Sequence, residues 1–252
     1  MAIEAFNNLL YIWIAMAIVL FPVQLKITAP YGRHTTTTWG ALMDNRTGWI
    51  LMEVVSILVM VYFFLDGKNE KSLPMWIFFG LWILHYLNRT FVFPLRTRTT
   101  GKKIPIFIVL SAIFFNVINA WTNGYFLGSL ATSYPDSWLT SPQFIIGFIV
   151  FLTGAIINIY SDNILLALRK PGEKGYKIPQ GGLFRWVSCP NHFGEIVEWI
   201  GFAIMCWNLA ALGFAIWTAA NLIPRAVSHH QWYQEKFKNY PKERQAVIPF
   251  LF

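Results

Sequence analysis

The sequence has few charged residues and few cysteines for a chain of 252 residues. Only 13% of the residues are charged, whereas 56% are hydrophobic and 17% are aromatic. This balance is unusual for a soluble protein and favours a polytopic membrane protein. The two cysteines, Cys189 and Cys206, are too few and too poorly placed for a disulfide framework or a zinc site.

The motifs of soluble nucleotide-binding proteins and of metalloproteases are missing as well. The chain has no G-x-G-x-x-G motif and no G-x-x-x-x-G-K-[ST] loop, so no soluble dinucleotide-binding fold is predicted. Its histidines show no H-E-x-x-H spacing, and we expect no catalytic metal. The net charge of +8 is spread over short loops between apolar runs, which argues against nucleic-acid binding.

Long apolar runs predict several membrane-spanning helices. Five of them lie near residues 6–23, 48–65, 73–94, 104–122 and 142–161. Each approaches the roughly 20 residues that cross a bilayer as a helix. A further apolar stretch, 195–228, is long enough for one tilted helix or two short ones, with Asn208 and Gly213 near its middle.

Basic residues decide between these two alternatives. They gather after the first, third and fifth runs and again in the tail, for example at Lys102 and Lys238. The loop after the fifth run contains Arg169, Lys170, Lys174, Lys177 and Arg185. The positive-inside rule places the side that is rich in basic residues in the cytoplasm, which requires two crossings or a re-entrant pair within 195–228. We therefore expect an all-α polytopic membrane protein with seven transmembrane helices and its N-terminus outside.

Polar residues that are costly beside lipid recur at helical spacing near the ends of these runs. Three such stripes are Asn158, Asp162 and Arg169; Asn191, Glu195 and Glu198; and Arg225, His229 and Tyr233. Glycines and prolines between the first two stripes rule out a continuing helix and predict a compact, turn-rich loop. Backbone N–H groups in such a loop can approach an anion. The alternative is an ordinary solvated loop with snorkelling basic side chains.

Two spans also contain chemically unusual residues. Glu53 is a solitary carboxyl group among apolar residues, and Tyr86 and Arg89 stand one turn apart in the next span. Burial should favour the neutral form of Glu53, which can donate a hydrogen bond. A polar contact between helices is the alternative, but an unpaired Glu within a span is rare enough to favour a functional site.

The segment from Asn158 to Trp199 resembles the steroid 5α-reductase family. It follows that family's order of Asn, Ser-Asp, Leu-Arg-Lys-Pro-Gly, Tyr, Ile-Pro-Gln-Gly-Gly-Leu-Phe and Asn-Phe-x-Gly-Glu-x-x-Glu-Trp. One departure is Phe193, which comes one place late. The resemblance continues at Tyr31-Gly32-Arg33-His34, His85-Tyr86, Arg89 and Tyr240-Pro241-Lys242, so it covers nearly the whole chain.

This resemblance implies a seven-helix membrane enzyme that reduces a conjugated enone with NADPH, its cytoplasmic loops enclosing the cofactor. In the family, residues matching Glu53 and Tyr86 hold the carbonyl oxygen of the substrate, and two donors aimed at that oxygen stabilise the enolate formed by hydride addition. These two are the expected catalytic residues. The expected cofactor-binding residues are the three polar stripes together with Tyr31, Arg33, Arg89 and Tyr176.

The same resemblance implies one membrane domain over 1–252, with 1–122 mainly on the substrate side and 142–252 mainly on the cofactor side. We expect a monomer that takes a steroid or similar enone from the bilayer and contacts membrane lipid. It would reside in the endoplasmic reticulum of a eukaryote or the inner membrane of a bacterium, with a cytoplasmic C-terminus.

Three alternatives stay open. Polyprenol and enoyl-CoA reductases share parts of the C-terminal pattern, although the presence of both Glu53 and Tyr86 favours a ketone. An isoprenylcysteine-type methyltransferase would use S-adenosylmethionine instead. The third alternative, a sterol-binding protein or small transporter, would not explain the polar stripes. Met52 stands where animal steroid reductases tend to carry Gln, which leaves the substrate fit near the carbonyl open.

Overall fold

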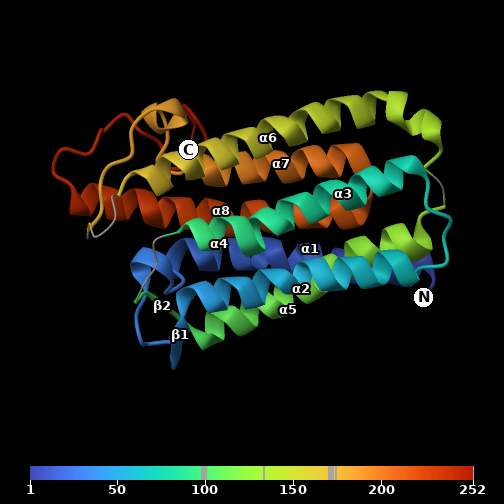
Figure 1. Ribbon diagram of the computed structural model, residues 1–252, viewed down its shortest axis with the longest axis horizontal. Helices are drawn as coiled ribbons and strands as arrows, with labels where there is room; N and C mark the ends of the chain where they lie inside the picture. Colours follow the sequence, from blue (N-terminus) through green and yellow to red (C-terminus); the bar gives the residue numbers. More distant parts are fainter. Residues whose placement is uncertain (98–100, 133, 170–172, 174, 252) are drawn as a thin grey trace. The chain divides into compact units, whose positions relative to one another are not determined.

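The computed structural model describes residues 1–97, 101–132, 134–169, 173 and 175–251, and most of them are helical (Figure 1). The α-helices are α1 (Ile3–Lys26), α2 (Asn45–Asp66), α3 (Leu73–Leu87), α4 (Phe93–Arg96), α5 (Ile106–Tyr125), α6 (Pro142–Ala167), α7 (Pro190–Cys206) and α8 (Leu209–Lys236). Two short strands, β1 (Leu42–Asp44) and β2 (Lys103–Pro105), pair antiparallel. Lys170, Pro171, Gly172 and Lys174 lie outside the described residues.

Short helical turns of other types connect these elements. Two π-helical turns, η2 (Asn88–Val92) and η3 (Phe126–Leu130), follow α3 and α5 directly. The 3-10 turns are η1 (Gly32–His34), η4 (Asp136–Thr140) and η5 (Gly182–Arg185). Because η2 runs on into α4, the chain stays helical from α3 to Arg96.

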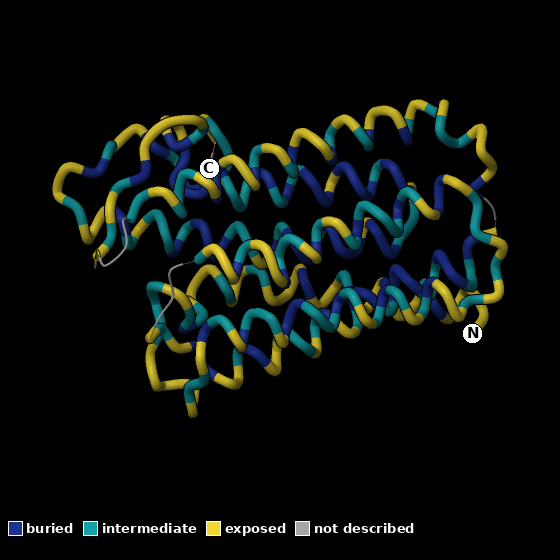
Figure 2. The backbone as a smooth tube through the Cα atoms, viewed as in Figure 1, coloured by how far each residue is buried: buried dark blue, intermediate teal, exposed yellow. Residues whose placement is uncertain are grey.

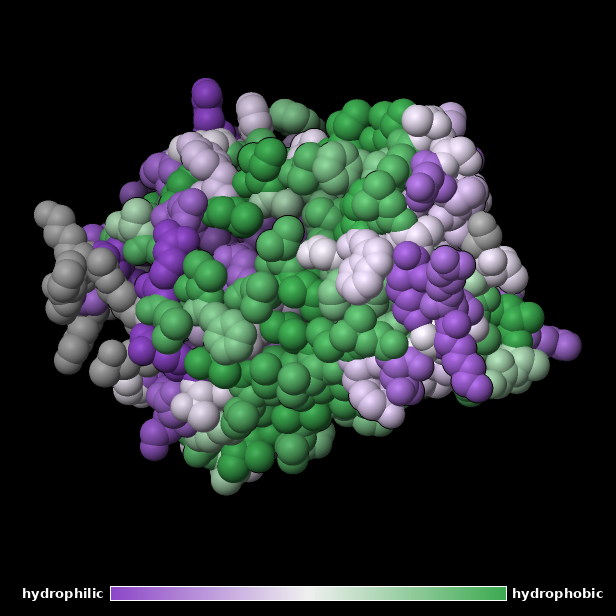
Figure 3. Space-filling model, turned by 45° about the vertical axis from the view of Figure 1, so that its right-hand side comes forward, coloured by the Kyte–Doolittle hydropathy of each residue, from purple (hydrophilic) through white to green (hydrophobic). Residues whose placement is uncertain are grey.

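Among the described residues, five helices are long and apolar enough to cross a membrane: α1, α2, α5 with η3, α6 and α8. The helices α3 and α7 have 15 and 17 residues. Hydrophobic residues cover much of the surface visible in Figure 3, as a bilayer requires. The predicted helical membrane protein is therefore confirmed, whereas the number of seven spans and their orientation stay predictions.

The apolar stretch 195–228 divides into two helices, α7 and α8. Trp207, which ends α7, has a left-handed backbone with φ of 48°. The side chain of Asn208 then accepts a hydrogen bond of 2.9 Å from the backbone N–H of Ala211 and caps the start of α8. The polar residue near the middle of the stretch thus marks the break.

The chain forms two compact units. Unit 1 contains Met1–Leu10, Ala29–Ile145 and Asn208–Ala211, and unit 2 contains Tyr11–Thr28, Ile146–Trp207 and Leu212–Phe252. The candidate residues divide between them: Tyr31, Arg33, Glu53, Tyr86 and Arg89 belong to unit 1, and the three polar stripes and Tyr176 belong to unit 2.

In unit 1, α2 and α5 pack against each other and both begin at the β1–β2 ladder. Asp44 caps α2 by accepting the Thr47 backbone N–H at 2.9 Å, and this hydrogen bond holds the pKa of Asp44 below its ordinary value. The Asn116 side chain donates to the Met52 carbonyl oxygen at 2.7 Å. This helix pair fixes the position of Glu53 on α2.

In unit 2, glycines allow the backbones of α6 and α7 to touch. Gly147 and Gly154 stand seven residues apart on α6, as do Gly194 and Gly201 on α7. A Cβ atom at any of these positions would overlap backbone atoms of the facing helix. Small residues at an interface allow membrane helices to approach closely. This contact places the polar ends of α6 and α7 beside each other.

Candidate active site

Glu53 and Arg89 face each other within unit 1. Glu53 is 9% exposed on α2, and the Nη2 atom of Arg89 lies 3.8 Å from its Oε1 atom. The Arg89 guanidinium also lies over the rings of Trp49 and Phe93, with its Cζ atom 5.2 and 5.5 Å from their centroids. Glu53 is therefore not solitary, although its neighbours in the sequence suggested that it was. Arg89 stands beside the proposed carbonyl-binding group, and its role in cofactor binding stays a prediction.

Tyr86 lies at the end of α3, where the helix passes into the π turn η2. Its side chain is 4% exposed, and its ring centroid is 5.2 Å from those of both Trp82 and His85. A π turn changes the direction of the side chains that follow it and is frequent at functional sites. Tyr86 thus lies just before the π turn, and Arg89, which Glu53 contacts, lies within it.

Trp49 is a residue of this group that sequence reasoning missed. It stands one turn before Glu53 on α2 and contacts Arg89. The Tyr31 ring meets it edge-on, with centroids 6.5 Å apart. Arg33 follows in η1 and buries its Nη1 atom. The four-residue spacing of Trp49 from Glu53 was the signal in the sequence.

In unit 2, the first two polar stripes meet directly. The Asn158 side chain donates to the backbone oxygen of Asn191 at 3.0 Å, and the Asn191 side chain donates to Oδ1 of Asp162 at 3.1 Å. Asn158 and Asp162 are almost fully buried. Glu198, two turns along α7 from Asn191, is buried as well, and Glu195 is half-buried. A carboxylate and two amides are therefore fixed side by side.

The basic end of the first stripe lies against aromatic rings. The Arg169 guanidinium carbon is 5.3 Å from the Tyr176 ring centroid, and Tyr176 meets Trp232 edge-on at 4.8 Å. Sequence reasoning missed Trp232, although it directly precedes Tyr233. This arrangement gives a cation supported by aromatic side chains, which suits both a phosphate and a flat base.

The third stripe lies along α8. Arg225 and Tyr233 are buried, whereas His229 is half-buried with its ring centroid 5.7 Å from that of His192. The Tyr233 ring stacks on Tyr240 at 5.3 Å, with the ring planes 7° apart. The stripe thus contacts both α7 and the C-terminal tail.

A buried polar cluster that the sequence did not predict holds this tail. The Ser188 hydroxyl lies 2.6 Å from Nδ1 of His230 and 2.7 Å from the Tyr240 hydroxyl, and burial raises the pKa of Tyr240. Arg244 is buried and donates to Gln180 Oε1 at 3.0 Å. These contacts join residues that are 42 to 64 positions apart in the sequence, so no local sequence pattern predicts them.

No group of three His, Cys, Asp or Glu side chains that would hold a metal ion occurs among the described residues. The chemistry available in unit 1 is that of a buried carboxyl group, a phenol and a guanidinium. In unit 2 it is that of buried amides and carboxylates next to cations and aromatic rings.

A family model and several known proteins place the chain in the same family. The family described as 3-oxo-5-alpha-steroid 4-dehydrogenase matches residues 102–252. The chain is 39% identical to steroid 5-alpha-reductase DET2 of Solanum lycopersicum, covering 98% of this chain and 97% of that protein. It is 40% identical to 3-oxo-5-alpha-steroid 4-dehydrogenase 1 of Rattus norvegicus, covering 97% and 95%, and 39% identical to the Homo sapiens protein of the same name, covering 97% and 94%. The chain therefore belongs to the 3-oxo-5-alpha-steroid 4-dehydrogenase family and is an oxidoreductase of that family.

Proposed function

We propose that this protein reduces the C4–C5 double bond of 3-oxo-Δ4-steroids with NADPH. Its relatives' names supply the reaction, and the burial of Glu53 and Tyr86 on adjoining helices of unit 1 carries the proposal for this chain. Incubation of the purified protein with NADPH and a steroid enone is expected to give the saturated ketone. Methyl transfer from S-adenosylmethionine, or reduction of enoyl thioesters alone, would contradict the proposal.

The proposed task of Glu53 and Tyr86 is to bind the 3-oxo group. When a hydride adds to C5, electron density moves onto the carbonyl oxygen, C4 accepts a proton, and two fixed donors stabilise the intermediate enolate. The phenol of Tyr86 is one donor. Glu53 is the other, and for this role its carboxyl group must carry a proton.

The contact between Glu53 and Arg89 is an ion pair by distance and not a hydrogen bond. Their 3.8 Å separation exceeds the range of a hydrogen bond, so this guanidinium nitrogen does not occupy the Glu53 oxygen as a donor. Arg89 is itself placed by the rings of Trp49 and Phe93. In the proposal, Arg89 adds positive charge near the oxygen on which negative charge develops.

The residues of unit 2 fit a phosphorylated dinucleotide. NADPH, when bound, supplies the hydride. Asp162 is a buried acceptor for a ribose hydroxyl group, the fixed amides of Asn158 and Asn191 are polar partners, and Arg169 is a cation for a phosphate. The rings of Tyr176 and Trp232 offer an apolar wall for a base.

Replacement of Arg169 by Ala should weaken NADPH binding about tenfold or more and leave NADH binding nearly unchanged. The reason is that a charge-assisted hydrogen bond to the 2′-phosphate disappears, and such bonds are worth about 1.5–3 kcal/mol. Titration of the purified variants with both nucleotides measures this selectivity.

Lys177→Ala is the matched control, because Lys177 is exposed and its Nζ atom already pairs with Glu173 at 2.7 Å. It should bind NADPH like the wild-type protein. Equal losses of NADPH and NADH affinity in Arg169→Ala would show that Arg169 positions the loop or another phosphate.

A further inference from the structure

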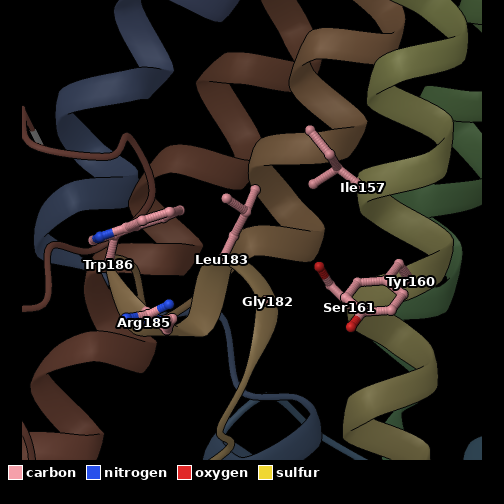
Figure 4. A pocket seen from close by; sticks show the side chains of 7 residues that line it. All are labelled: Ile157, Tyr160, Ser161, Gly182, Leu183, Arg185 and Trp186. Carbon is pink, nitrogen blue, oxygen red and sulfur yellow. The ribbon is translucent and has the colours of Figure 1, made fainter.

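A cavity of about 320 Å³ lies within unit 2, between the C-terminal half of α6 and the turn η5 (Figure 4). Figure 4 shows the α6 residues on one side of it and the side chains of the turn on the other. Its lining consists of Ile157, Tyr160, Ser161, Gly182, Leu183, Arg185 and Trp186. None of these residues has a role in the proposed reduction. The volume is at the lower end of the range for small-molecule sites.

Two glycines bring the turn against α6 without filling the cavity. Gly181 and Gly182 have φ angles of 88° and 48°, in the left-handed region that favours glycine. A Cβ atom on Gly182 would lie 2.7 Å from Cε1 of Tyr160. The close approach of turn and helix therefore requires glycine, and it leaves room beside Ile157 and Leu183.

The lining carries one charged residue, and it is a cation. Arg185 is exposed, and its guanidinium carbon lies 5.9 Å from the Trp186 ring centroid. Trp186 and Tyr160 are 40% and 55% exposed. Arginine, tryptophan and tyrosine together are typical of the boundary between bilayer and water, where the guanidinium reaches lipid phosphates. The polar part of a ligand at this site is therefore expected to be anionic.

An apolar stripe on α6 leads away from the cavity. Its members follow helical spacing and are all exposed: Ile149 (58%), Leu152 (39%), Ile156 (66%) and Ile159 (45%). Figure 2 shows such exposed residues along the length of α6. On a helix long and apolar enough to span a membrane, this face suits an acyl chain. The stripe ends beside Tyr160.

The C-terminal tail extends the apolar rim next to Trp186. The Phe250 ring centroid is 5.7 Å from that of Trp186, yet 79% of Phe250 is exposed. Its φ angle of 65° is an outlier for so large a residue. The next residue, Leu251, is 78% exposed. Exposure of these apolar side chains to water is unfavourable, whereas their contact with the lipid interface is favourable.

We propose that this cavity binds a membrane phospholipid with an anionic head group. The phosphate lies at Arg185, the glycerol region fills the space between Ile157 and Leu183, and an acyl chain follows Ile156 along α6. An anion free in solution could bind Arg185, but it has no acyl chain to contact the exposed isoleucines of α6. The lipid site is independent of the proposed reductase activity.

The test uses the full-length protein in nanodiscs of equimolar phosphatidylcholine and phosphatidylglycerol, with the lipids that stay bound counted by native mass spectrometry. The wild-type protein should retain phosphatidylglycerol in preference to phosphatidylcholine. Arg185→Gln should lower retained phosphatidylglycerol about fivefold, the effect expected of one basic residue near an anionic surface. Ile157→Trp, which fills the cavity, should lower the retention of both lipids.

Lys177→Gln is the control for net charge, because it removes one exposed cation of the same loop outside the cavity lining. It should retain phosphatidylglycerol like the wild type. Thermal unfolding checks that each variant is folded, and Arg185→Lys, which keeps the charge, should retain most of the lipid if Arg185→Gln is unstable. Equal retention of the two lipids by the wild type overturns the proposal. So does equal loss in Arg185→Gln and Lys177→Gln, or unchanged retention in Ile157→Trp.

Discussion

Replacement of Tyr86 by Phe should lower the rate of hydride transfer about a hundredfold or more, the usual cost of removing one preorganised oxyanion donor. NADPH affinity should change little, because the proposal assigns Tyr86 to the carbonyl oxygen of the substrate and not to the cofactor. Glu53→Ala should have a similar effect on the rate. Glu53→Gln should lie between Glu53→Ala and the wild type, because an amide is a weaker donor than a carboxylic acid.

Single-turnover oxidation of NADPH with a saturating enone measures the rate, and a separate NADPH titration measures affinity. Tyr62→Phe is the matched control, because it removes a phenol oxygen from an exposed position on α2 of the same unit. Glu53 and Tyr86 both stabilise the negative charge that develops on the carbonyl oxygen. The fold-loss in rate of the double variant should therefore be smaller than the product of the two single losses. A normal rate in Tyr86→Phe would remove Tyr86 from the mechanism, and a collapse of NADPH affinity would assign it to the cofactor.

Replacement of Gly154 by Ala should destabilise the protein by about 1–3 kcal/mol, as overpacking commonly does. The added methyl group would overlap the Glu198 backbone and the carbonyl oxygen of Gly194. The helices α6 and α7 must then separate, and one turn further along α6 the hydrogen bond between Asn158 and Asn191 would lengthen. We therefore expect a lower melting temperature together with weaker NADPH binding.

Gly80→Ala provides the control for this variant. Gly80 lies inside α3, and a methyl group added there would meet no atom within 4 Å, so alanine should be tolerated or even stabilise the helix. Thermal unfolding and NADPH titration of both variants test the contact. An unchanged melting temperature in Gly154→Ala would contradict backbone contact between α6 and α7.

Local patterns predicted much of this fold. Apolar runs of bilayer length predicted the helices, and the distribution of basic residues predicted that the stretch 195–228 is divided. The structure places the break at Asn208, whose side chain caps α8. Helical spacing placed Asn158 with Asp162 and Asn191 with Glu198. That these two stripes meet was not predictable from spacing alone, because it depends on the glycine contact between the helices.

Contacts between distant segments were not predictable. The π turn that contains Arg89 has no clear sequence signal, and it accompanies the pairing of Arg89 with Glu53. The cluster of Ser188, His230 and Tyr240 depends on where the tail crosses the loop. A periodic pattern reports which face of a helix is polar, whereas the partner of that face is decided by tertiary packing.

The central claim is tested most directly by following the transferred hydrogen. The purified protein is incubated with NADPH deuterated at the reactive position of the nicotinamide and with a 3-oxo-Δ4-steroid, and the product is analysed by mass spectrometry and NMR. We expect a saturated 3-oxosteroid with one deuterium at C5 and a solvent-derived proton at C4. An unreduced steroid, or deuterium at C4 in place of C5, would contradict the account.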